Sequence, residues 1–181
     1  MSTGKISVRY AKALFEAARE AGKSEAVYQD VKLLFETCDV EGFSFMLETP
    51  VAKPSQKISI FTALFEGKVE KLTLDFLELL AKSKREFYLK NISRSYLTLH
   101  QKSNNIKPVR LITSTSFDEI QISEITKTVE ENLKSKIELT KQVNPEIIGG
   151  FILQIENTQY DASISSKLLE IKRSLMQSNI Q

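Results

Sequence analysis

The chain has 181 residues, a net charge of +2 and a single cysteine. This length is enough for one large domain or two small ones, and a charge so near neutral gives no argument by itself for nucleic acid or an acidic membrane surface. The lone Cys38 cannot form an internal disulfide, which suits a reducing compartment. Nowhere do about 18 apolar residues run together, and no signal-peptide pattern follows the first residues, so any membrane association is expected to come through partners.

A wide apolar face marks the first predicted helix, over residues 6–21. Its apolar side chains cover an arc of roughly 200°, about twice the stripe that a surface helix needs. Two interpretations are open. The helix is either a central bundle helix contacted from two sides, or it packs on one side and receives a partner helix on the other.

Helical spacing continues through five more predicted helices. The second begins near Ser24, the third follows Gly42, the fourth begins at Pro54, the fifth spans about 70–81 and the sixth about 89–99. The fifth also has more apolar surface than one contact uses, which hints at a groove shared with the first; a buried central helix is the alternative. The candidate partner-binding residues on these two helices are Tyr10, Ala13, Leu14, Ala17, Phe76, Leu79 and Leu80.

The best domain boundary is a polar stretch over residues 101–108 that ends in proline. Residues 1–104 are predicted to form an all-α six-helix bundle. Beyond it the period alternates between strand and helix, in the order β-α-β-β-β-α. Residues 105–181 are therefore predicted to form a small α+β domain.

Two adjacent glycines, Gly149 and Gly150, open the apolar run of the last hairpin. Because glycine has no Cβ, the pair allows a bulge or a close backbone approach where a strand begins. A phosphate loop is disfavoured, since the glycines precede a strand and no Lys-Ser/Thr follows. After a polar turn at residues 156–159 and a short strand, Asp161 or Ser163 is expected to cap the closing helix.

No pattern of catalytic residues stands out. The only histidine, His100, has no metal ligand at a suitable spacing and is far from Cys38 in sequence, so neither a metal nor a cofactor is expected. A helical RNA-binding module is a second hypothesis, and its basic residues would be Lys82, Lys84, Arg85, Lys90 and Arg94. A structural adaptor with helix-receiving surfaces is the third.

Motifs at both ends of the chain resemble one known family. The run Asn144-Pro145-Glu146-Ile147-Ile148-Gly149-Gly150-Phe151, the later Asp161-Ala162-Ser163-Ile164 and the pair Leu168-Leu169 are similar in order and spacing to the C-terminal part of the δ subunit of bacterial F-type ATP synthase. The segment from Ser7 to Phe15 resembles the opening helix of the same family. The family usually has glycine where this chain has Ala162.

The resemblance implies a peripheral-stalk, or stator, subunit without a catalytic site or cofactor. The all-α domain would hold the N-terminal helices of α subunits, and the C-terminal domain would hold the C-terminal ends of two b subunits. The resemblance also implies a peripheral location on the cytoplasmic side of the bacterial inner membrane, no contact with nucleic acid, and a monomer outside the complex.

Overall fold

The computed structural model describes residues 3–49, 52–115, 117–155 and 158–178. The chain divides into two compact units, Met1–His100 and Gln101–Gln181. Helices and a mixed sheet are both present, which confirms the α+β class. That the two parts fold independently stays a prediction.

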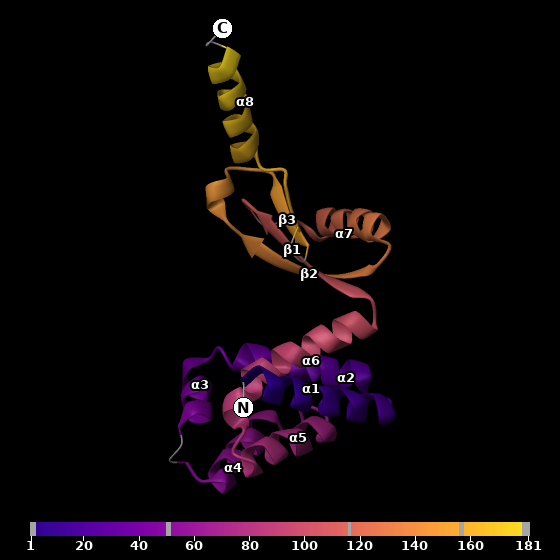
Figure 1. Ribbon diagram of the computed structural model, residues 1–181, viewed down its shortest axis with the longest axis vertical. Helices are drawn as coiled ribbons and strands as arrows, with labels where there is room; N and C mark the ends of the chain where they lie inside the picture. The colour runs from indigo at the N-terminus through magenta and orange to yellow at the C-terminus, as the bar shows by residue number, and fades with distance from the viewer. Residues whose placement is uncertain (1–2, 50–51, 116, 156–157, 179–181) are drawn as a thin grey trace. The chain divides into compact units, whose positions relative to one another are not determined.

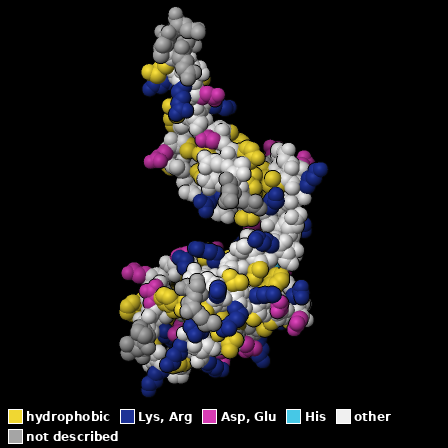
Figure 2. All heavy atoms as spheres, viewed as in Figure 1, with side chains coloured by type: hydrophobic (Ala, Val, Ile, Leu, Met, Phe, Trp, Pro, Cys, Tyr) yellow, Lys and Arg dark blue, Asp and Glu magenta, His cyan; other side chains and the backbone are white. Residues whose placement is uncertain are grey.

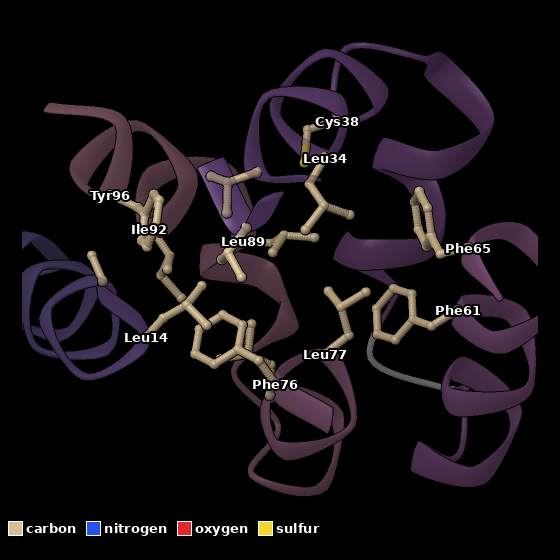
Figure 3. Close-up of a cluster of buried hydrophobic side chains, with 14 of the residues drawn as sticks. Leu14, Leu34, Cys38, Phe61, Phe65, Phe76, Leu77, Leu89, Ile92 and Tyr96 are labelled. Carbon is tan, nitrogen blue, oxygen red and sulfur yellow. The ribbon is translucent and has the colours of Figure 1, made fainter. Parts of the chain in front are cut away.

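The first unit is built from helices (Figure 1). Their bounds are α1 Thr3–Glu20, α2 Ser24–Thr37, α3 Glu41–Glu48, α4 Pro54–Phe65, α5 Lys71–Lys82, the short 3-10 helix η1 Glu86–Tyr88, and α6 Leu89–Ser103, which runs on into the second unit. Proline at the start of α4 fits because its missing N–H is not needed there. In Figure 3, Leu14, Phe76 and Ile92 from three different helices point into the same space. This core also encloses Cys38.

A buried ion pair crosses the same unit. The Lys57 ammonium in α4 donates to the Glu86 carboxylate at 2.7 Å and to the Leu47 carbonyl oxygen at 3.3 Å. Lys57 is 2 % exposed and Glu86 is 9 % exposed. Removing either partner would leave a buried charge uncompensated, so the pair fixes α4 against η1 and the end of α3.

The second unit is a four-stranded sheet with a helix packed on it. The strands β1 Ile106–Thr113, β2 Lys136–Val143, β3 Phe151–Ile155 and β4 Thr158–Asp161 lie in the order β2-β1-β3-β4. β1 pairs in parallel with β2 and antiparallel with β3, and β3 pairs antiparallel with β4. Helix α7, Glu119–Leu133, connects the parallel pair and lies beside the sheet (Figure 1). Helix α8, Ile164–Ser178, follows β4.

Alternation in β1 decides which face of the sheet is covered. Val109 and Leu111 are buried with Val129 of α7 and Leu153 of β3, whereas Arg110 between them is exposed. A capping box starts α7: the Asp118 carboxylate accepts from the Gln121 backbone at 2.8 Å, and the Asp118 backbone donates to the Gln121 side chain at 3.2 Å.

Two details differ from the sequence prediction. The stretch expected to be a linker is mostly ordered secondary structure, because α6 continues to Ser103 and β1 begins at Ile106. Only residues 104–105 join them, and Asn105 turns the chain with a φ of 52°. In the last hairpin, Thr158 and Gln159 belong to β4 rather than to a turn; the other two residues of the predicted turn, 156–157, lie outside the described residues.

Candidate partner-binding groove

An apolar groove lies between α1 and α5, with a volume of about 560 Å³. Its lining residues are Arg9, Tyr10, Ala13, Leu14, Ala17, Leu72, Asp75, Phe76 and Leu79. Figure 2 shows hydrophobic side chains reaching the surface of the helical unit among lysines and arginines. Leu79 is 50 % exposed, so it is available for contact at the surface of the helix bundle.

The wide apolar arc of α1 serves two surfaces. Ala11 and Ala18 are completely buried and pack in the core of the bundle, whereas Ala13 is exposed and Ala17 is partly exposed along the groove. Leu14 lies between these sides, buried at 3 % and still part of the groove floor. One side of the arc therefore packs in the bundle core and the other forms an open surface. This arrangement agrees with the interpretation in which α1 receives a partner helix on its outer side.

Six of the seven predicted residues line this one groove, and Leu80 does not. Leu80 has no exposed surface and belongs to the bundle core. It follows Leu79 in the helix, so its side chain points about 100° further round the axis and faces inward. Leu80 is therefore corrected from a partner-contact residue to a core residue.

Three lining residues were absent from the predicted set. Leu72 lies four residues before Phe76 in α5, and the helical repeat could have placed it on the same face. Arg9 and Asp75 are polar residues at the margins of the apolar arcs, and apolar spacing does not identify such positions. The Arg9 guanidinium lies over the Tyr10 ring at 5.6 Å from its centroid. The groove thus has an apolar floor with one cationic and one anionic side chain beside it.

The basic residues of the RNA hypothesis are largely engaged within the chain. Lys82 pairs with Glu78 at 2.7 Å, and Lys90 pairs with Asp39. The guanidinium of Arg85 lies over the Tyr88 ring, and that of Arg94 lies over the Phe35 ring. Two of these cations are thus paired with carboxylates and two lie over aromatic rings.

Cys38 and His100 both lie inside the bundle. Burial raises the pKa of the Cys38 thiol to about 11, so the thiol is protonated at neutral pH and unsuited to nucleophilic chemistry. The His100 ring stacks on Tyr28 with centroids 4.0 Å apart. The described residues bring together no group of three side chains able to hold a metal ion. In the same ranges, no helix is both long and apolar enough to cross a membrane.

The double glycine forms a tight junction between β3 and the end of β4. Gly150 has a φ of +78°, and a Cβ there would lie 2.4 Å from the Ala162 carbonyl oxygen. A Cβ on Gly149 would lie 2.7 Å from Cδ1 of Ile164. The Ala162 N–H donates to the Phe151 carbonyl at 3.0 Å across this junction. Gly150 therefore permits a backbone approach that other residues would block, whereas the neighbour of Gly149 is the end of a flexible side chain.

Asp161 and Ser163 start α8 from this junction. The Ser163 hydroxyl accepts from the Ser166 N–H at 3.2 Å, and the Asp161 carboxylate accepts from the Ser163 N–H at 2.8 Å and the Ser166 hydroxyl at 2.7 Å. The bonds from the Ser166 and Ser163 side chains, aided by the Ser163 N–H, hold the pKa of Asp161 below its ordinary value. Both predicted capping residues thus take part in one cap.

Helix α8 presents an apolar stripe to solvent. The stripe consists of Ile164, Leu168, Ile171 and Leu175, at spacings of four, three and four residues, and each is at least 46 % exposed. This is the repeat with which one helix packs along another. An isolated helix of this length is marginal in water, so a partner along the stripe would stabilise it.

Residues 6–175 match the family described as ATP synthase delta (OSCP) subunit. The chain belongs to that family. The subunit delta of Bacteroides fragilis is 34 % identical over 99 % of this chain and 98 % of its own, and that of Parabacteroides distasonis is 33 % identical over 98 % and 99 %. A chain of the Toxoplasma gondii mitochondrial ATP synthase hexamer shares the fold, with a TM-score of 0.70 at 21 % identity over 94 % of this chain and 97 % of that one.

Family membership decides between the hypotheses drawn from the sequence. The protein is a stator subunit of the ATP synthase, which works in ATP synthesis as a structural member of the peripheral stalk. It interacts with other subunits of the complex and is associated with the membrane through that complex. The RNA-binding hypothesis is set aside.

Proposed function

We propose that the α1–α5 groove receives an N-terminal helix of an ATP synthase α subunit. Residues 1–104, as a six-helix bundle, form the part that binds the catalytic head, and residues 105–181, in the order β-α-β-β-β-α, form the part that binds the ends of the b subunits. The protein has no catalytic site and works on the cytoplasmic side of the bacterial inner membrane.

The observation that carries this proposal is the groove itself. Both walls are apolar, and the exposed Ala13 and partly exposed Ala17 leave room for the backbone of another helix to come close. An amphipathic helix laid into such a groove buries its apolar face on a few anchors. Leu79 and the ring of Tyr10 are the anchors that this chain offers, and the Tyr10 hydroxyl can remain in water.

The charged rim suits the same type of occupant. Arg9 and Asp75 are both exposed beside the apolar floor. A bound helix can place its own polar face toward them while its apolar side faces the floor. Rim charges of this kind steer association and fix the register more than they add affinity.

The second contact is proposed along α8. Its exposed stripe has the spacing of a helix-packing seam, and the b subunits would supply the matching helix at their C-terminal ends. With one partner held by each part of the chain, the protein connects the head to the membrane sector. Its mechanism is mechanical: the central shaft tends to drag the head round, and the strength of the helix contacts resists that drag.

Calorimetry with a peptide of the α-subunit N-terminus tests the groove. Replacing the exposed Ala13 by glutamate puts a charge in the groove without emptying the core. Burying that unpaired charge is expected to weaken binding by at least about a hundredfold. The matched control is Ala63→Glu, at an exposed position of α4 outside the groove, and it is expected to bind like the parent.

Thermal melts of both variants complete the test. Each is expected to melt within a few degrees of the parent, because surface substitutions change stability by about 0.5 kcal/mol or less. If Ala13→Glu folds and binds the peptide as tightly as the parent, the α subunit docks elsewhere. If it unfolds while Ala63→Glu does not, Ala13 belongs to the core and the groove is not an open surface.

A further inference from the structure

An acidic side chain from α2 holds the start of α5. Oδ2 of Asp30 accepts a hydrogen bond from the Thr73 hydroxyl at 2.6 Å and another from the Glu70 N–H at 2.9 Å. Asp30 is 8 % exposed and Thr73 is completely buried. Glu70 is the N-cap residue of α5, and its own side chain makes no capping bond. The first turn of α5 is therefore hydrogen-bonded to a side chain of another helix, α2.

These hydrogen bonds fix the position of α5, which apolar packing alone does not. Contact between Leu77 or Leu80 and the core favours burial, but the hydrophobic effect is non-directional and does not fix how far a helix slides or turns. Hydrogen bonds are directional and set a position. A negative charge at the N-terminus of a helix is also favoured by the helix dipole. Lys23, just beyond α1, adds an outer link to Glu70 at 2.6 Å.

The same helix forms one wall of the groove. Leu72, Phe76 and Leu79 follow the tied turn along α5 and line the groove with α1. A change in the position of the first turn of α5 would move all three together relative to α1, because a helix is a stiff rod. Asp30 is not among the groove residues, so its effect on a bound helix would pass through α5.

We infer that Asp30 is a positioning residue, which fixes the α5 wall relative to α1 and thereby sets the affinity of the groove without touching its occupant. The part concerning affinity rests on the function proposed above, whereas the part concerning the position of α5 does not. The two parts are therefore tested by separate measurements on the same full-length variants.

The position of α5 is measured by the distance between two spin labels. Lys12→Cys in α1 and Lys82→Cys in α5 place the labels at exposed sites outside the groove, and Cys38→Ala removes the native thiol. Double electron–electron resonance then gives the distribution of α1–α5 distances. The parent is expected to show one narrow distribution, and Asp30→Ala is expected to broaden or shift it.

Two further variants separate positioning from a general loss of stability. Asp30→Asn keeps an oxygen that can accept both hydrogen bonds, and asparagine caps helices as well as aspartate does. The Asp30→Asn variant is therefore expected to keep the narrow distance distribution of the parent. Val31→Ala removes buried volume from the same helix without removing a hydrogen bond, and is expected to lower the melting temperature but leave the distance unchanged.

For the α-subunit peptide, Asp30→Ala is expected to weaken binding about tenfold, as for residues that couple to a site without touching the ligand.

The outcomes are distinct. A distribution in Asp30→Ala that equals that of the parent overturns the inference, and so does equal broadening in Val31→Ala. If the distribution broadens as expected while even the parent fails to bind the peptide, the positioning role stands and the proposed groove function fails. Should Asp30→Ala not fold, Thr73→Val removes one of the two bonds, and an unchanged distance and affinity in that variant would overturn the inference.

Discussion

The rings of Tyr10 in α1 and Phe76 in α5 meet edge to face, with centroids 6.4 Å apart and planes at 65°. Phe76 is 7 % exposed, whereas Tyr10 is only partly buried. The pair joins the two walls at the floor of the groove, and Tyr10 keeps part of its surface accessible there. This contact joins the packing of the bundle to its proposed binding surface.

A buried and a half-exposed residue of the groove are expected to respond differently to truncation. Leu14→Ala empties a site that is 3 % exposed and should cost about 2–5 kcal/mol of stability. Leu79→Ala truncates a half-exposed side chain and should cost less than about 1 kcal/mol of stability while weakening peptide binding. Urea denaturation and calorimetry measure the two quantities, and a large stability loss in Leu79→Ala would show that this side chain belongs to the core.

Sequence periodicity could locate the groove because both of its helices follow a regular 3.6-residue repeat. The excess of apolar arc in α1 is the signal, and the structure divides that arc between Ala11 and Ala18 on the inner side and Ala13 and Ala17 on the outer side. A helical wheel does not say where along the arc the core ends. For that reason the apolar spacing predicts Leu80 in the groove, although the residue faces inward.

The junction at Gly150 should not tolerate a side chain. A Cβ would lie 2.4 Å from a backbone oxygen and the φ is +78°, so Gly150→Val combines a clash with an unfavourable backbone conformation. We expect a clearly lower melting temperature for the second unit of the full chain, followed by circular dichroism. Gly42→Ala is the control, because Gly42 lies in α3 with no atom within 4 Å of an added Cβ. Equal melts for Gly150→Val and the parent would contradict the close approach.

Stability is expected to fall in alkali. Burial raises the pKa of Cys38 from 9.0 to about 11 and, with lesser contributions from Asp30 and Glu25, that of Tyr96 from 10.0 to about 12. Both groups hold their protons more tightly when folded, so the folded state binds more protons than the unfolded state in these windows. Stability is therefore lost as pH rises from about 9 to 12.

Tyr96→Phe isolates the tyrosine part of this effect. The Tyr96 hydroxyl is buried without a hydrogen-bond partner among the described residues, so its removal is expected to be harmless at neutral pH. Urea midpoints between pH 10 and 12 should then fall less steeply than in the parent. Tyr160→Phe, at a 58 % exposed position, serves as the control and should follow the parent. An unaltered slope in Tyr96→Phe would contradict the assignment.

The apolar stripe on α8 is expected to contribute to partner binding but not to the stability of the isolated chain. Ile171 and Leu175 are 55 % and 61 % exposed, so changing both to alanine should leave the melting temperature unaltered. The same change should weaken binding to the C-terminal part of a b subunit by at least about tenfold. Glu170→Ala with Arg173→Ala, on the other side of the helix, should bind like the parent in surface plasmon resonance. Equal binding by both double variants would remove α8 from the contact.

Other parts of the site depend on contacts between distant segments, which local patterns do not encode. Asp30 lies on α2 and its partners lie 40 and 43 residues further along, so spacing gave no sign of the link. Two glycines before a strand predict a close backbone approach. They do not predict that the segment approached by Gly150 is the one at Ala162. The link between α6 and β1 is shorter than the polar stretch over residues 101–108 suggests, since polar composition cannot distinguish an exposed helix end from a loop.

Photo-crosslinking in the assembled complex tests the central claim most directly. A benzophenone amino acid replaces Leu79 at the groove, and in a second variant it replaces Ala63 on α4, which is exposed but outside the groove. After irradiation of the purified ATP synthase, the account predicts a covalent product between the Leu79 variant and the N-terminal segment of an α subunit, and none with that segment from the Ala63 variant. A Leu79 variant that crosslinks to a different subunit, or an Ala63 variant that captures the same segment equally well, would contradict the account.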